Sequence, residues 1–228
     1  MFRRPRGYCD VLTIIDYGMG NLRNVYMAFR RLGVESRVTS DPQEVRDAEV
    51  LVLPGVGAFG DAVDTIRRMG LEEPILEAID EDRPFLGICV GLQLLFEASE
   101  EMGEHRGLGV LAGRVRRFPR DLTVPHMGWN QIYQERDVPL WRGLPDGSYA
   151  YFVHSYYVDP EDEDVIAATT DYGEDEAGEY IRPPVIYTSA IARGNLYAIQ
   201  FHPEKSQNVG ERILRNFALH VGLLEDDV

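Results

Sequence analysis

Pro84-Phe-Leu-Gly-Ile-Cys-Val-Gly-Leu-Gln-Leu-Leu-Phe96 is the stretch that decides the fold. Its first part, Phe85–Ile88, is a short apolar run that predicts a buried strand, and the apolar spacing of Leu92–Phe96 predicts a helix behind it. Between the two, Gly87-Ile-Cys-Val-Gly91 has the spacing Gly-x-nucleophile-x-Gly, which is typical of a strand that turns sharply into a helix. Cysteine occupies the position of the nucleophile.

Cys89 lies where such a turn holds its reactive group. Gly87 and Gly91 remove side chains that would collide in the turn, and the strained backbone lifts the sulfur out of the sheet edge. A helix N-terminus favours the reactive thiolate form, and the N–H of Val90 is placed to donate to an oxyanion. The alternative is a buried structural cysteine, because free cysteine is among the most buried residue types. A base near Cys89 would favour catalysis.

Length and composition limit the kind of protein. The chain has 228 residues, and we expect a single domain, 1–228, with a substantial core. Its two cysteines, Cys9 and Cys89, are too few for a disulfide framework, and Cys9 is expected in the core or at its rim. The basic start Met1–Tyr8 has no apolar region, and no stretch approaches about 18 uninterrupted apolar residues. We therefore expect a cytoplasmic protein with no membrane partner.

The chain is strongly acidic. Its formal net charge is −15, with 38 acidic and 23 basic residues, which argues against nucleic acid as the main partner. Lys205 is the only lysine. An acidic, lysine-poor surface suits a protein that works in molar salt, where screening removes self-repulsion, and we hypothesise a halophilic source. The alternative is ordinary acidity in a GC-rich genome that favours arginine codons.

The first hundred residues alternate between strand and helix patterns. This alternation predicts a parallel sheet with helices on both faces, in which ligands bind at the carboxyl ends of the strands, where Cys89 lies. Asn21 is expected to cap the first helix and Gly33 to end it. The predicted strands are 10–16, 35–39, 50–54 and 85–88. The predicted helices are 22–32, a short helix that begins at 42, a helix that ends at about 69, and 71–82.

From Gly103 the pattern changes to strands rich in aromatic and β-branched residues. We expect strands at 113–118, 128–134, 148–158, 165–170, 185–192 and 195–201, and we expect these strands to pair as antiparallel hairpins. Asp159–Asp164 and Glu174–Glu179 are predicted to be solvated acidic loops, and Gly210–Val221 an amphipathic helix. The expected fold class is α/β, an open, mainly parallel sheet flanked by helices with an antiparallel, strand-rich C-terminal half.

A glycine-rich loop, Gly55-Val-Gly-Ala-Phe-Gly60, follows the strand at 50–54. It lacks the Gly-Lys-Ser/Thr ending of a phosphate-binding loop and matches a dinucleotide fingerprint poorly, so no cofactor is expected. We interpret it as a loop that presents backbone N–H groups toward Cys89. The alternative is a plain tight loop, since glycine is common in turns.

The base for Cys89 must come from five histidines. His202 follows a clear strand and has its own acid, because His202 and Glu204, two residues apart on an extended chain, project to the same side. Glu204 can then fix the tautomer of the imidazole and stabilise the imidazolium. Cys89, His202 and Glu204 together predict a triad for acyl transfer. A metal site is the weaker alternative, because the sequence has no paired zinc-ligand spacing, and no metal is expected.

These motifs resemble a known family. Leu86–Gln93 and Phe201–Glu204 resemble the class I (triad) glutamine amidotransferases. More narrowly, the chain resembles the glutaminase subunits of imidazole glycerol phosphate synthase over nearly its whole length. The matching motifs are Asp16-Tyr-Gly-Met-Gly-Asn-Leu-Arg23, Pro54-Gly-Val-Gly57, Val124-Pro-His-Met-Gly-Trp-Asn130, Tyr151-Phe-Val-His-Ser-Tyr156 and His202-Pro-Glu-Lys-Ser206. Val90 and Leu92 stand where the family usually has Leu and Met, and both keep an apolar side chain.

The resemblance implies a flavodoxin-like fold and the hydrolysis of L-glutamine to glutamate and ammonia. The ammonia would pass to a (β/α)8-barrel cyclase subunit during histidine biosynthesis. Cys89 would be the nucleophile, His202 the base and Glu204 its orienting acid. The remaining implied sites are an oxyanion hole at Val56, Gly57 and Val90, substrate contacts at Gly55, Gln93, His154, Ser155 and Tyr156, and a partner interface at Asn21, Arg23, Met127, Trp129 and Lys205.

Three alternatives stay open on the sequence. The nearest is another class I glutaminase, serving anthranilate, guanylate or pyridoxal phosphate synthesis, against which Asp16–Arg23 and Val124–Asn130 argue. The second is a cysteine hydrolase or peptidase that acts without a partner. The third is a catalytically idle subunit that only binds glutamine, and the intact Cys89, His202 and Glu204 disfavour it.

Overall fold

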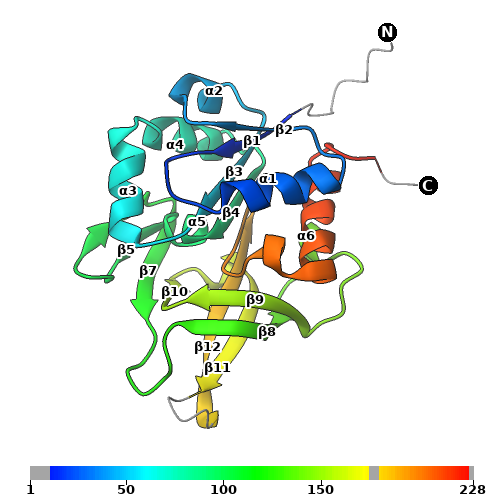
Figure 1. Cartoon of the computed structure of the whole chain (residues 1–228). Coiled ribbons are helices and arrows are strands. Elements are labelled where there is room, and N and C mark those ends of the chain that lie inside the picture. Colours follow the sequence, from blue (N-terminus) through cyan, green and yellow to red (C-terminus); the bar gives the residue numbers. More distant parts are fainter. Residues whose placement is uncertain (1–10, 175–179, 226–228) are drawn as a thin grey trace.

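The computed structural model describes residues 11–174 and 180–225. A twisted sheet runs through the molecule, with helices packed against its N-terminal half and antiparallel strands forming the other half (Figure 1). The elements are, in chain order, β1 (Leu12–Ile15), α1 (Leu22–Arg31), β2 (Ser36–Thr39), α2 (Pro42–Arg46), β3 (Val50–Gly55), α3 (Phe59–Arg68), α4 (Glu72–Asp80), β4 (Phe85–Cys89), α5 (Val90–Gln93), β5 (Phe96–Ser99), β6 (His105–Arg106), β7 (Leu111–Arg117), β8 (His126–Gln134), η1 (Pro139–Trp141), β9 (Ser148–His154), β10 (Tyr156–Pro160), η2 (Glu163–Val165), β11 (Ile166–Glu174), β12 (Tyr180–Arg193), β13 (Leu196–Ile199), η3 (Pro203–Lys205) and α6 (Gln207–His220).

The N-terminal half is the predicted parallel sheet. In the described chain, β2, β1, β3, β4 and β13 lie side by side in that order, and all four pairings are parallel. Every residue of β1, β3, β4 and β13 is buried, as expected for parallel strands that are covered on both faces. Gly55 at the end of β3 pairs with Cys89 at the end of β4. The carboxyl ends of the central strands therefore meet at Cys89.

The C-terminal half has the expected antiparallel character, with β8 paired to β9, β10 to β7 and β12, and β11 to β12. β13, which was expected only in an antiparallel hairpin, pairs antiparallel with β12 but also in parallel with β4. The strand expected at 148–158 is two strands, however. β9 pairs with β8 and β10 pairs with β7, so the chain changes its partner at Ser155. The carbonyl of Ser155 accepts a hydrogen bond from the N–H of Phe118 at 3.2 Å.

The helix predicted after Cys89 is only one turn long, which corrects the sequence-based expectation. α5 ends at Gln93, and Phe96 begins a short strand, β5, that the sequence did not reveal. The cause is the chain that follows, because the N–H of Leu108 binds the carbonyl of Leu94, and the N–H groups of Val110 and Leu111 bind the carbonyl of Leu95. With these carbonyls occupied, the helix cannot continue although its apolar spacing would allow it.

Two other boundaries differ from expectation. β11 and β12 extend the hairpin as far as the pair Glu174↔Tyr180, so strands occupy part of the expected acidic loop, and 175–179 lie outside the described residues. α6 begins at Gln207 rather than at Gly210. Cys9 and Met1–Tyr8 also lie outside the described residues. In the described part of the chain, no helix has the length and apolar character needed to cross a bilayer.

Candidate active site

The turn after β4 has the strained geometry that its sequence predicts. Cys89 has φ +55° and ψ −111°, in a region that residues with a side chain rarely adopt. A Cβ at Gly91 would overlap the backbone carbonyl of Leu53, and one at Gly87 would lie 2.9 Å from the Cβ of Ala198. The two glycines are therefore required because strands β3 and β13 pack directly against the turn. Cys89 is 4% exposed.

His202 and Glu204 are joined by a hydrogen bond, with 2.9 Å between Nδ1 and Oε1. The prediction that they face each other is confirmed, but the reason given for it is wrong. Glu204 lies in the 3-10 turn η3 rather than on an extended chain. The N–H of Lys205 closes this turn on the carbonyl of His202 at 3.0 Å.

Asn21 also differs from its predicted role as a helix cap. It stands at the N-cap of α1, yet its side chain makes no capping bond. Its Nδ2 instead donates to Oε1 of Glu204 at 3.0 Å. Asn21 thus links the start of α1 to the acid that holds His202.

Burial disfavours the charged forms of His202 and Glu204, but the contact between the two side chains favours these charged forms more strongly. Burial lowers the pKa of His202, but the adjacent Cys89 sulfur and the Glu204 carboxylate outweigh it and raise the pKa overall. Burial raises the pKa of Glu204, but His202 and the hydrogen bond from Asn21 bring it below its usual value. Nε2 of His202 makes no hydrogen bond to any described residue. The ring is therefore oriented through Nδ1, with Nε2 left available.

Replacing the carboxylate with an amide should make stability depend less on pH. In Glu204→Gln, the loss of unfolding free energy relative to the unchanged protein should be largest between about pH 4.5 and pH 6.5, the ordinary pKa values of Glu and His. It should shrink as the pH falls through the lowered folded pKa of Glu204, and also as the pH rises toward the raised folded pKa of His202, because the charged pair is then lost. A lowered pKa in the folded state means that the fold stabilises the ionised carboxylate of Glu204, so this contribution to stability is lost when the carboxylate is protonated. Urea denaturation from pH 3 to 8 measures this, with Glu211→Gln, at an exposed position on α6, as the baseline. A difference that grows on acidification below about pH 4.5 would contradict the pKa direction.

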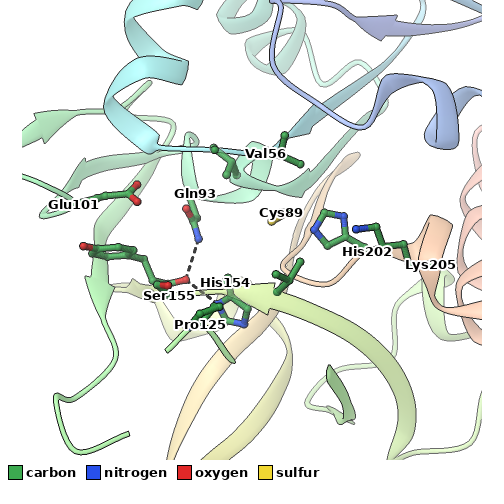
Figure 2. Close-up of a pocket in the computed structure, with 13 residues that line it drawn as sticks. Val56, Cys89, Gln93, Glu101, Pro125, His154, Ser155, His202 and Lys205 are labelled. Carbon is green, nitrogen blue, oxygen red and sulfur yellow. Dashed lines mark hydrogen bonds between the residues drawn. The ribbon is translucent and has the colours of Figure 1, made fainter. Parts of the chain in front are cut away.

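Cys89 and His202 line a cavity of about 270 Å³ at the carboxyl end of the sheet. Figure 2 shows both side chains on one side of it, with Gln93, His154 and Ser155 on the other. Its walls come from the loop after β3, from the Cys89 turn, from the break between β9 and β10, and from η3. The lining residues are Val56, Gly57, Cys89, Val90, Gln93, Glu101, Pro125, Val153, His154, Ser155, Tyr156, His202 and Lys205.

Most residues predicted for the oxyanion hole and the substrate line this cavity. The exception is Gly55, which lies behind it beside Cys89 in the sheet. Gln93 is 4% exposed, and its Nε2 donates to the carbonyl of Tyr156 at 2.9 Å and to Oε1 of Gln200 at 3.1 Å. Because its nitrogen is already bonded within the protein, Gln93 has only its carbonyl oxygen to offer a ligand.

Of the residues predicted for a partner interface, Lys205 lines the cavity and the other four do not. Met127 and Trp129, on β8, are 66% and 46% exposed, which is unusual for such large apolar side chains. Lys205 Nζ lies 5.6 Å from the ring centre of Tyr151 on the neighbouring strand β9. Arg23 lies apart from the cavity, near the exposed face of α1.

The sequence reasoning missed three polar groups at the site. Glu101 lines the cavity, and its Oε2 accepts the backbone N–H of Phe59 at 2.7 Å. Gln200 is fully buried, and its Nε2 lies 3.7 Å from the sulfur of Cys89. The hydroxyl of Tyr17 is buried without a hydrogen-bond partner among the described residues, next to Gly55. Two of the three had a signal in the sequence, since Gln200 directly precedes the Phe201–Glu204 motif and Tyr17 lies within the Asp16–Arg23 motif.

The described residues contain no group of three His, Cys, Asp or Glu side chains that could hold a metal ion. The cluster instead has the parts of a covalent site, namely a strained cysteine, a buried imidazole and a carboxylate that orients it. Such an arrangement can attack a carbonyl carbon and transfer an acyl group through a thioester.

Comparison with known proteins agrees with this chemistry. The family model for glutamine amidotransferase class-I matches residues 13–221. Proteins named imidazole glycerol phosphate synthase subunit HisH are similar to the chain: one from Syntrophotalea carbinolica is 54% identical over 91% of this chain and 98% of its own length. Another, from Geobacter metallireducens, is 50% identical over 91% and 97%.

Solved structures support the fold alone. A crystal structure of a glutamine amidotransferase superposes with a TM-score of 0.68 at 21% identity, covering 93% of this chain and 99% of the other. A structure of PurLQS from Thermotoga maritima gives a TM-score of 0.70 at 17% identity, with the same coverage of 93% and 99%. The α/β architecture with a mainly parallel sheet and added antiparallel strands is therefore shared with class I amidotransferases.

Proposed function

The chain belongs to the class I glutamine amidotransferase family and, within it, to the HisH subunits of imidazole glycerol phosphate synthase, and from this membership we propose that Cys89, His202 and Glu204 hydrolyse L-glutamine. The single observation that carries this assignment is the cavity in which the strained Cys89 and a carboxylate-bound His202 lie side by side. The reaction needs no cofactor and no metal, because the sulfur and the imidazole supply both the nucleophile and the proton transfer.

In the first half of the reaction, the sulfur of Cys89 forms a bond to the carboxamide carbon of glutamine. His202 takes the thiol proton and gives it to the amide nitrogen, so that the C–N bond breaks and ammonia leaves. Glu204 keeps Nδ1 protonated and stabilises the imidazolium. The raised pKa of His202 supports this role, because its cause is the pair of groups that the mechanism uses.

In the second half, water attacks the thioester carbon while His202 accepts its proton. The C–S bond then breaks, glutamate leaves, and Cys89 recovers its proton. In both halves the carbonyl oxygen becomes an oxyanion, and the N–H of Val90 and an N–H from the Val56–Gly57 segment would stabilise it. Removal of one such donor typically costs about 3 kcal/mol of barrier. The positions of Val56, Gly57 and Val90 in the wall beside Cys89 support this assignment.

The amino-acid end of glutamine carries an ammonium and a carboxylate, and the far end of the cavity suits the ammonium. Glu101 supplies a carboxylate there, and Gln93 has its carbonyl oxygen left as an acceptor. We assign these two residues to the α-ammonium group. The backbone and side chains of the His154–Tyr156 segment would complete the substrate site, whereas Gly55, which does not line the cavity, would have no contact with glutamine.

Removing the charge of Glu101 should weaken glutamine binding. In Glu101→Gln, KM for glutamine should rise about 10- to 100-fold with little change in kcat, because a charge-assisted hydrogen bond to the ammonium is lost while the amide oxygen can still accept from Phe59. Steady-state ammonia release measures both constants. Glu100→Gln is the matched control, since Glu100 also accepts a backbone N–H, from Arg117 at 2.7 Å, but does not line the cavity. Equal KM values in both variants would remove Glu101 from the substrate site.

The partner follows from the family, since the relatives are named as subunits of a synthase. We propose a (β/α)8-barrel cyclase subunit that receives ammonia and covers the mouth of the site. Large exposed side chains on β8 and β9 support this position, because β9 ends in the cavity residues Val153 and His154. Met127, Trp129 and Tyr149 on these two strands are 66%, 46% and 52% exposed. The proposed interface comprises Asn21, Arg23, Met127, Trp129 and Lys205.

Three broader expectations belong to the same proposal. A single domain over residues 1–228 is supported by the continuous strand pairing from β2 to β6 in the described chain. A cytoplasmic location is supported by a mechanism that needs a reduced thiol. The halophilic source remains a hypothesis that rests on the net charge of −15.

The test is ammonia release from glutamine by the chain alone and with the purified cyclase subunit and its nucleotide ligand, each in low and high KCl. Slow release that rises sharply with the liganded partner supports the synthase subunit. Fast release that is indifferent to the cyclase would instead favour another glutaminase or a stand-alone cysteine hydrolase. Full activity and stability at low salt would remove the halophilic hypothesis.

A further inference from the structure

Two buried histidines, one in the wall of the substrate cavity and one behind it, share one tyrosine hydroxyl. Oη of Tyr187 lies 3.1 Å from Nδ1 of His126 and 3.2 Å from Nε2 of His154. The three side chains come from β8, β9 and β12 and are 2–7% exposed. His154 lines the cavity, whereas Tyr187 and His126 lie behind it. We call these three residues the His-Tyr-His group, and only His154 among them has a role in the proposed substrate site above.

At the cavity end of the group, one hydrogen bond determines which ring nitrogen of His154 carries the proton. Its Nδ1 lies 2.8 Å from the carbonyl oxygen of Tyr156. A carbonyl only accepts hydrogen bonds, so Nδ1 of His154 carries a proton. Figure 2 shows that the amide of Gln93 reaches the same carbonyl. His154 and Gln93 therefore hold the Tyr156 carbonyl together.

The opposite end fixes the proton of His126. Nδ2 of Asn130 lies 3.3 Å from Nε2 of His126. The orientation of this amide is determined independently, because Nδ2 also donates to the carbonyl of Asp171 at 2.7 Å and Oδ1 accepts the N–H of Gln131 at 2.8 Å. Nε2 of His126 is thus an acceptor, and in a neutral ring the proton lies on Nδ1.

The hydroxyl of Tyr187 is the junction between these two ends. Burial lowers the pKa of His126 to about 4. Burial and the proximity of His126 lower the pKa of His154 to about 3. Both rings are therefore neutral near pH 7. Tyr187 must then accept from Nδ1 of His126 and donate to Nε2 of His154. Thr170, another polar neighbour of Tyr187, gives its own hydroxyl proton to the carbonyl of Gln131 at 2.9 Å. The four hydrogen bonds therefore all have their donor on the Asn130 side and their acceptor on the cavity side. Asn130 donates to His126, His126 to Tyr187, Tyr187 to His154, and His154 to the Tyr156 carbonyl.

We propose that Tyr187 is a positioning residue for glutamine hydrolysis, which holds His154 as its Nδ1–H tautomer and thereby fixes the Tyr156 carbonyl against which Gln93 is oriented. The inference rests on the proposed function, which gives Gln93 and Tyr156 to the substrate. The backbone needs such support here, because the chain leaves β9 and joins β10 at Ser155, where its strand partner changes. The opposite end of the group lies on β8, which also carries the exposed Met127 and Trp129.

The tautomers can be observed directly. Long-range 15N–1H correlation spectra of the 15N-histidine-labelled chain near pH 7 should show two neutral histidines besides His202 as Nδ1–H tautomers, although free histidine prefers Nε2–H. His202, whose Nδ1 is bound to Glu204, is identified separately by its loss in His202→Asn. In Tyr187→Phe these two signals should shift, which assigns them. Two Nε2–H tautomers, or an imidazolium at either position, would overturn the proposal, and this measurement on the unchanged chain stands even if the variant fails to fold.

The kinetic test compares two buried tyrosines in one aromatic cluster. Tyr187→Phe keeps a ring 5.2 Å from Phe118 and loses only the shared hydroxyl. Tyr172→Phe, the matched control, keeps a ring 5.3 Å from Phe118 and loses a hydroxyl that donates to the carbonyl of Thr123 at 2.8 Å. In the complex with the liganded cyclase, Tyr187→Phe should raise KM for glutamine about fivefold, the factor for one neutral hydrogen bond, with kcat within about twofold.

The control should leave KM unchanged even where it lowers thermal stability as much. An unchanged KM in Tyr187→Phe, or an equal rise in Tyr172→Phe, would overturn the positioning role. Failure of the proposed function is a separate result, because it would appear as an unchanged protein that releases no ammonia from glutamine.

Discussion

Replacing Cys89 with alanine should lower partner-stimulated ammonia release by roughly 10⁶-fold, the loss expected when the nucleophile of a catalytic triad is removed. No other described thiol or hydroxyl occupies the end of β4, and His202 alone cannot form the acyl intermediate. Alanine is smaller than cysteine and removes no hydrogen bond other than the weak one from Gln200 at 3.7 Å. The fold and the affinity for the cyclase should therefore be retained.

Cys9→Ala is the matched control, because Cys9 is the other cysteine of the chain. It should keep the full rate, and alkylation with iodoacetamide should inactivate it as it inactivates the unchanged protein. Ammonia release that survives in Cys89→Ala would exclude the thioester mechanism. Absence of release in the unchanged protein, with the liganded cyclase present, would favour the idle glutamine-binding subunit.

Local spacing was enough to predict much of the site. Five residues, Gly87–Gly91, imply the turn because any side chain at its two glycines meets the backbone or side chains of neighbouring strands. Glu204 could be paired with His202 because the two are close in sequence, so even an incorrect local conformation left them within reach of each other. The parallel sheet followed from the alternation of strands and helices.

What the sequence could not reveal depends on contacts between distant residues. The one-turn length of α5 is imposed by the carbonyl contacts of Leu94 and Leu95 with the chain from Leu108 to Leu111, and no pattern near Cys89 records them. Glu101 enters the cavity only because β5 follows that short helix. Tyr187 is 61 residues from His126, and its importance emerges only when β8, β9 and β12 are brought together.

The same dependence on neighbouring strands makes Gly91 the glycine of the turn that is hardest to replace. Its missing Cβ would fall on the backbone carbonyl of Leu53 in β3. That carbonyl belongs to a fully buried central strand, and it cannot move away as the end of a flexible side chain could. Any accommodation must displace either the Cys89 turn or β3, which also leads into the Val56–Gly57 wall of the cavity.

Gly91→Ala should therefore lower the free energy of unfolding by about 3 kcal/mol, at the upper end of typical overpacking costs, and lower Tm by roughly 10 °C. The remaining folded protein should have little glutaminase activity, because the N–H of Val90 and the sulfur move with the turn. Gly109→Ala is the control, since it has φ +68°, lies in open space, and should lose only about 1 kcal/mol from left-handed backbone strain. Thermal and urea denaturation of both variants separates the two costs. If Gly91→Ala were as stable as Gly109→Ala, strand β3 would not press against the turn as the structure requires, and the strained Cys89 conformation would need another cause.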